Sequence, residues 1–105
     1  MLIDLETYAP GQVSKLEAPL RELKLSEAMR IGAALRPQCY GNYFIDGRSC
    51  AIGAAWEGFG FSPPKDSLTI TVWWSNHKWP NVIALNDHTC WTREAIADWL
   101  ERQGL

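Results

Sequence analysis

The chain has 105 residues, of which 47% are hydrophobic and 21% are charged. This is the composition of a globular domain, and it excludes disordered, fibrous and collagen-like proteins. Ten basic and twelve acidic side chains give a net charge of −2. Because nucleic-acid binding is driven by excess positive charge, we expect no nucleic-acid partner. No apolar run approaches the roughly 18 residues of a membrane span, and the N-terminus lacks a signal-peptide pattern. We therefore expect one cytoplasmic domain over residues 1–105, with no membrane segment.

The first predicted helix follows a proline-interrupted arm. Two prolines break the apolar pattern of residues 1–24, which predicts an extended arm with at most a short helix. Ser26 then suits an N-cap, and the Arg36-Pro37 pair ends helical structure. These signals predict a helix over residues 26–36.

Turn residues surround a short extended stretch in the middle of the chain. Residues 43–45 read Tyr-Phe-Ile between a Gly-Asn pair and an Asp-Gly pair, which predicts one arm of a small hairpin. Ser49 then caps a second helix, predicted over residues 49–58. Its apolar side chains recur at the i, i+3, i+4, i+7 spacing of a buried stripe.

The second half of the chain is predicted to hold a sheet and a last helix. In residues 68–74, Leu-Thr-Ile-Thr-Val-Trp-Trp, β-branched and aromatic side chains alternate, which is typical of a strand. Residues 82–85 suggest a second short strand, and Thr92 caps a helix over residues 92–102. We therefore predict a small α+β domain of about three helices packed with a short sheet or hairpin. The expected core comprises Ile52, Trp56, Phe59, Ile70, Val72, Ile96, Trp99 and Leu100.

The run Ile-Gly-Ala-Ala occurs twice, each time inside a predicted helix. Small residues allow two backbones to approach closely. We expect Gly32 and Gly53, the glycines of the two runs, to lie where helices cross or where a helix contacts a strand.

Three cysteines, Cys39, Cys50 and Cys90, have no paired metal-ligand spacing, so we predict reduced thiols, no zinc and no cofactor. Cys50 stands in the first turn of the predicted second helix, where the helix dipole lowers the pKa of a thiol. Two interpretations remain open for it. It is either a small packed thiol or the nucleophile of a hydrolase that uses His88 or His77 as its base.

Asn86 and Asp87 also have two interpretations. Either side chain is of the type that orients a catalytic imidazole. Both also bond readily to nearby backbone groups, and we assign them to the turn that leads into the last helix rather than to a site.

Six tryptophans are the most unusual feature of the composition. Trp73 and Trp74 are adjacent on the predicted strand and would point to opposite faces of the sheet. A domain of this size buries six indoles with difficulty, which predicts a binding surface around Trp73, Trp74 and Trp79. The alternative is a sheet covered on both faces.

Two blocks of the sequence carry a resemblance to a known family. Residues 49–55 read Ser-Cys-Ala-Ile-Gly-Ala-Ala, and residues 85–99 read Leu-Asn-Asp-His-Thr-Cys-Trp-Thr-Arg-Glu-Ala-Ile-Ala-Asp-Trp. With residues 25–32, they resemble a family of small uncharacterised bacterial and phage-encoded proteins. The resemblance implies a bacterial or phage source and names no activity. We expect a non-enzymatic interaction or regulatory module acting on another protein, with the cysteine hydrolase as the alternative.

Overall fold

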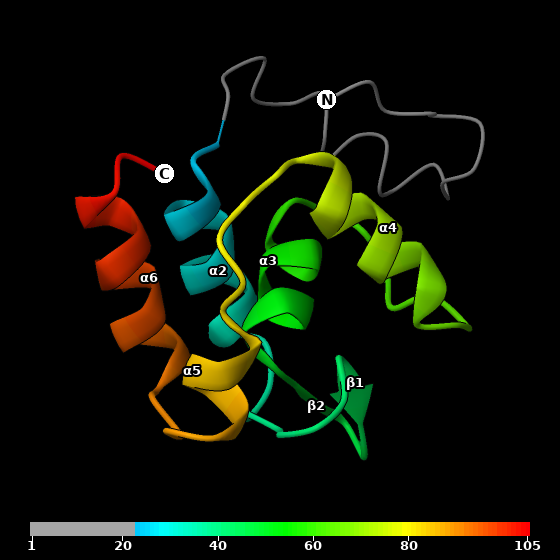
Figure 1. Cartoon of the computed structure of the whole chain (residues 1–105). Helices are drawn as coiled ribbons and strands as arrows, with labels where there is room; N and C mark the ends of the chain where they lie inside the picture. Colours follow the sequence, from blue (N-terminus) through cyan, green and yellow to red (C-terminus); the bar gives the residue numbers. More distant parts are fainter. Residues whose placement is uncertain (1–22) are drawn as a thin grey trace.

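The computed structural model describes residues 23–105, so the arm predicted for residues 1–24 lies almost wholly outside the described residues. The described part is an α+β fold of five helices and one antiparallel hairpin, as the sequence predicts for the fold class (Figure 1). Its elements are α2 (Leu25–Ala33), β1 (Phe44–Ile45), β2 (Arg48–Ser49), α3 (Ala51–Gly58), α4 (Leu68–Asn76), α5 (Ile83–Asp87) and α6 (Arg93–Arg102).

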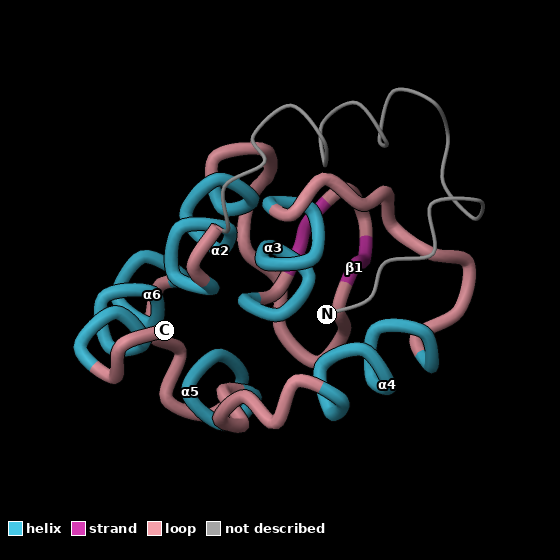
Figure 2. Tube along the Cα trace, turned by 90° about the horizontal axis from the view of Figure 1, so that it is seen from above, coloured by secondary structure: helices cyan, strands magenta, loops and turns pink. Residues whose placement is uncertain are grey.

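Helix α3 is the central element of the fold. Figure 2 shows α2, α4, α5 and β1 placed around it, with α6 on the outer side of α2. The hairpin and α5 lie at the same end of the molecule, below α3 in Figure 1. Among residues 23–105, no helix has the length and apolar character needed to cross a membrane.

Glycines allow α3 to pack closely on its neighbours. A Cβ at Gly32 in α2 would overlap the backbone of Ala54 in α3, which confirms the helix contact predicted for Gly32. A Cβ at Gly53 would overlap the backbone oxygen of Tyr43, directly before β1, so Gly53 lies where α3 contacts the hairpin. Glycine is therefore needed at both positions because the backbone of a neighbouring segment leaves no room for a side chain, and not because of an unusual φ angle.

The predicted helix ends are correct to within a few residues. Helix α2 starts one residue before the predicted boundary and ends at Ala33. The N-cap residue of α3 is Cys50, whereas the sequence predicts Ser49. Thr92 caps α6 as predicted, because its side-chain oxygen accepts a hydrogen bond from the backbone N–H of Ala95 (3.1 Å).

The hairpin is also confirmed. Phe44 pairs with Ser49 and Ile45 with Arg48, so the turn consists of the Asp-Gly pair that the sequence singles out. Its aspartate, Asp46, has φ = +50° and the following glycine has φ = +72°. Positive φ at both central positions gives a two-residue hairpin turn the twist of its strands.

The strand predicted for residues 68–74 is wrong, because this stretch forms α4. Its buried side chains are Ile70, Trp73 and Trp74, at the i, i+3, i+4 spacing of one helix face. Just before the helix, the carboxylate of Asp66 accepts a hydrogen bond from a backbone N–H of the first turn (3.0 Å). The β-branched residues favour a strand only weakly, and burial of the three large side chains decides the conformation.

Two further predictions for this half of the chain are wrong. Val72 is 47% exposed, because the helix turns it away from the core in which it was expected. Residues 82–85 do not form a strand either, since α5 begins directly after the buried Val82. An apolar run of this length fits one turn of a helix as well as a short strand, so the sequence pattern of residues 82–85 does not distinguish the two.

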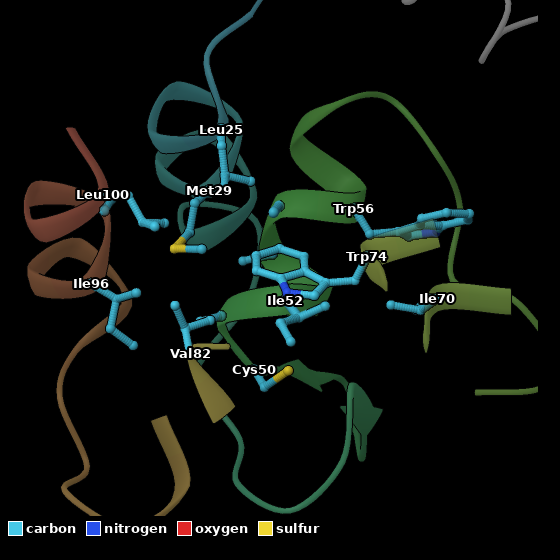
Figure 3. Packing of buried hydrophobic residues seen from close by; sticks show 14 of the residues in the cluster. Leu25, Met29, Cys50, Ile52, Trp56, Ile70, Trp74, Val82, Ile96 and Leu100 are labelled. Carbon is cyan, nitrogen blue, oxygen red and sulfur yellow. The ribbon is translucent and has the colours of Figure 1, made fainter. Parts of the chain in front are cut away.

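Most of the core side chains come from α2, α3, α4 and α6. Figure 3 shows Met29 of α2, Ile52 of α3, Trp74 of α4 and Ile96 of α6 converging on one region. Most of the predicted core is buried there. The two predicted members that are only partly buried are Phe59 and Trp99, which pack against the edge of this cluster.

Candidate functional site

The tryptophan surface predicted from the sequence is not exposed as expected. Trp73 and Trp74 are only 8% and 7% exposed, because neighbours on a helix lie about 100° apart and both of these rings face inward. Trp79 is partly buried beside them, with its ring centre 5.2 Å from that of Trp73. Exposure of Trp73 and Trp74 is therefore a wrong prediction. Among the tryptophans of residues 23–105, Trp91 is exposed, at 38%, and Trp99 is partly buried like Trp79.

His77 belongs to the same aromatic cluster. Its ring stacks on Trp79 with centres 4.0 Å apart and planes at 8°, and Phe59 lies parallel to Trp79 at 6.0 Å. Burial lowers the pKa of His77. The arrangement packs this imidazole among rings rather than beside a thiol.

Cys50 is the N-cap of α3, and its thiol is buried. Its sulfur accepts a hydrogen bond from the backbone N–H of Gly53 (3.5 Å), and the residue is 7% exposed. Burial raises the pKa of the Cys50 thiol to about 11, despite the hydrogen bonds from the helix start. A cysteine nucleophile requires the opposite shift.

A pocket of about 290 Å³ opens next to this thiol, between the loop before β1, the start of α4 and helix α5. We call it the Asp87 pocket. Cys50 and Asp87 share it, whereas neither His77 nor His88 is among its described lining residues. It is lined by Gly41, Asn42, Tyr43, Cys50, Ser67, Thr71, Ile83 and Asp87.

Two hydroxyl groups form a hydrogen-bonded chain in the wall of the pocket. The hydroxyl of Thr71 donates to the backbone oxygen of Ser67 (3.0 Å), so its single proton is used. The hydroxyl of Tyr43, 2.7 Å from that of Thr71, therefore donates to it. Both protons are engaged, so the Tyr43 oxygen keeps unused lone pairs and acts as an acceptor.

Asn86, which precedes Asp87 in the chain, connects three segments and is almost fully buried. Its oxygen accepts from the backbone N–H of Ala51 at the start of α3 (3.0 Å) and from the side chain of Gln38 (2.9 Å). Its amide donates to the backbone oxygen of Cys39 (3.0 Å) and to the carboxylate of Asp87 (2.7 Å). Asn86 satisfies backbone groups as expected, but these groups lie 35 and 47 residues away. The turn predicted for Asn86 and Asp87 is wrong, because both residues belong to helix α5.

Arg93 is a buried cation that sequence reasoning missed. Its guanidinium donates to the hydroxyl of Ser49 (2.8 Å) and to the backbone oxygens of Ala33 (3.1 Å) and Arg36 (2.7 Å). Burial lowers the pKa of its guanidinium. The side chain fastens the start of α6 to the end of α2, where carbonyl groups attract a cation. No local pattern distinguishes it from an exposed arginine in the first turn of a helix.

No cluster of three or more metal-ligating side chains occurs within residues 23–105. No protein-family model, no curated protein and no solved structure matches the chain.

Proposed function

We propose that this chain is a non-enzymatic interaction module whose partner protein docks around the Asp87 pocket. The observation that carries the proposal is a set of exposed apolar side chains at the pocket and on the adjoining face of α4. Leu68, Val72 and Ile83 are 67%, 47% and 42% exposed. Ile83 lines the pocket, and the other two directly follow the pocket residues Ser67 and Thr71 on α4. We call these three side chains together with the Asp87 pocket the docking surface.

Exposed apolar side chains next to a pocket with polar groups suit a protein partner, because burying them removes apolar area from water while the polar groups fix orientation. Each large side chain fully buried in this way contributes roughly 1.5–3 kcal/mol. The proposal transfers the binding role expected of the tryptophans to a neighbouring part of α4.

The cysteine hydrolase has less support. Burial favours the neutral form of the Cys50 thiol, and no histidine is among the described residues of its pocket. General-base activation of a thiol needs an imidazole within hydrogen-bond reach. The non-enzymatic module does not depend on either group.

The source and compartment are part of the same proposal. The resemblance of residues 49–55 and 85–99 to small bacterial and phage proteins supports a bacterial or phage source. Cys39, Cys50 and Cys90 are all free thiols, which fits a reducing cytoplasm.

The test is affinity capture from a lysate of the source organism with the wild type, Val72→Asp and Ile31→Asp. Val72 and Ile31 are both helical and both 47% exposed, but Ile31 lies on α2, outside the docking surface. We expect one or more proteins to be captured by the wild type and by Ile31→Asp and to be lost with Val72→Asp. Thermal unfolding of each variant verifies that the fold is retained. Equal capture by both variants, or hydrolytic activity that Cys50→Ser abolishes, contradicts the proposal.

A further inference from the structure

The Asp87 pocket contains a carboxylate without a cationic partner in the described chain. Asp87 is the single charged residue among the described residues that line the pocket, and no ion pair of residues 23–105 includes it. The side chain is half-buried. A partly desolvated carboxylate gains more from an incoming cation than one in open water, because the effective dielectric constant is lower.

The carboxylate is also held in place. The amide of Asn86 donates to it at 2.7 Å, and Asn86 is itself fixed by the backbone of Ala51 and of Cys39. Asn86 therefore acts as a positioning residue for Asp87. A pre-oriented acceptor loses little conformational entropy when a ligand binds.

The other groups of the pocket favour a ligand that is rich in hydrogen-bond donors. The hydroxyl protons of Tyr43 and Thr71 are used along their chain, which leaves acceptor lone pairs. Asn42 and Ser67 either donate or accept, so they do not oppose such a ligand. Tyr43, one of the lining residues, also carries an aromatic ring.

A guanidinium group matches these features better than other cations do. It is planar, carries five N–H donors, pairs with a carboxylate through two bonds and stacks on aromatic rings. An ammonium group is a compact charge with three donors. A volume of about 290 Å³ is at the lower end for ligand pockets and fits one side chain rather than a larger molecule.

We propose that the Asp87 pocket receives an arginine side chain of the partner protein, with the Asp87 carboxylate as its counter-ion and the Tyr43 and Thr71 oxygens as further acceptors. This inference rests on the proposed interaction function and specifies the chemistry of the partner. Leu68, Val72 and Ile83 then bury the apolar residues that flank the arginine.

The test is an NMR titration of the whole chain with N-acetyl-arginine amide at millimolar concentrations. The probes for comparison are the citrulline amide, which keeps the shape without the charge, and the corresponding lysine amide. We expect the arginine probe to shift the backbone resonances of Tyr43, Thr71 and Ile83, and both other probes to bind at least about tenfold more weakly. No shift with arginine, or equal affinity for citrulline or lysine, overturns the inference.

The variant for this test is Asp87→Asn, which keeps the side-chain shape and an oxygen for the Asn86 amide. We expect it to bind the arginine probe at least about tenfold more weakly, since it loses a charge-assisted bond. Asp46→Asn, in the exposed hairpin turn, is the matched control and is expected to bind as the wild type does. If Asp87→Asn does not fold, Thr71→Val replaces it, with several-fold weaker binding expected. Wild-type affinity in the folded variant overturns the inference.

The two proposals fail in different ways. A partner that is lost with Val72→Asp but kept with Asp87→Asn leaves the interaction function standing and overturns the arginine site. Specific binding of the arginine probe, together with equal capture by Val72→Asp and Ile31→Asp, supports the arginine site and overturns the proposed role of the exposed apolar side chains in docking a partner protein.

Discussion

The backbone of Ala54 in α3 lies directly against Gly32 in α2, with no room for a side chain between them. A second contact of the same kind joins Gly58 to the backbone of Ala28. In each helix the two contact residues are four positions apart, and their order is reversed between the helices. The pairs therefore form a continuous antiparallel seam of small residues, and the two backbones approach more closely than ordinary side chains permit.

Replacing Gly32 by Ala should destabilise the protein strongly. The added methyl group overlaps a backbone carbonyl, which cannot rotate away, so we expect a loss at or above the upper end of the roughly 1–3 kcal/mol typical of overpacking. Urea unfolding followed by tryptophan fluorescence measures it. Ile31→Ala, at the neighbouring exposed position, is the control and should leave the free energy of unfolding almost unchanged. A stable Gly32→Ala variant would show that the seam is looser than described.

Asn86→Ala should cost more stability than Asp87→Ala. Removing the amide leaves the Ala51 N–H and the Cys39 carbonyl buried without their partner, at about 1–3 kcal/mol for each group. Asp87→Ala removes a single bond to Asn86, and we expect a loss of about 0.5–2 kcal/mol. Denaturant unfolding of the two variants provides the comparison. The reverse order would mean that Asp87, not Asn86, stabilises the start of α3.

Arg93→Met should destabilise the protein by about 3 kcal/mol or more, because it leaves several buried acceptors without a charged donor. Arg93→Lys should recover only part of this loss, since a single ammonium nitrogen cannot reach all the acceptors that the two terminal nitrogens of the guanidinium group bind. Arg102→Met, exposed at the other end of α6, is the matched control. Full stability of Arg93→Lys would show that charge alone, without the fork geometry, is sufficient.

The three thiols should differ in reactivity. In the folded protein at pH 8, iodoacetamide should modify the exposed Cys90 first and the buried Cys39 and Cys50 far more slowly. Burial raises the pKa of both buried thiols and shields them from the reagent. Mass spectrometry of peptides over time gives the three rates, and the rates in urea provide the reference. Rapid alkylation of native Cys50 that His88→Ala slows would restore the nucleophile interpretation.

Cys50 should also make stability fall at alkaline pH. Its pKa is about 11 in the folded chain against an ordinary 9.0, so the unfolded state loses the proton first as the pH rises. The neutral Cys50 thiol makes its full contribution to the unfolding free energy below pH 9. As the pH rises to about 11, the unfolding free energy falls by on the order of 2 kcal/mol. Cys50→Ser keeps a capping side chain but does not titrate in this range. The difference in unfolding free energy between wild type and variant should therefore decrease from pH 8 to pH 11. A constant difference would contradict the raised pKa.

The features that the sequence alone determined are those set by near neighbours in the chain. The Asp-Gly turn of the hairpin and the cap of α6 at Thr92 follow from a side chain or a φ angle acting within three residues. Gly32 could be assigned to a helix contact because glycine inside a helix usually marks a place where another backbone approaches closely. Such signals do not depend on the rest of the fold.

Tertiary structure decided the conformation of residues 68–74 and the chemistry around Cys50. The first stretch satisfies both a strand pattern and a helix pattern, and burial of Ile70, Trp73 and Trp74 against distant residues selects the helix. Asn86 and Arg93 bind backbone groups 35 to 60 residues away, so no local spacing identifies them. The residues that line the pocket beside Cys50 likewise come from three separate segments. Burial of the thiol, rather than the helix start predicted from the sequence, sets its pKa.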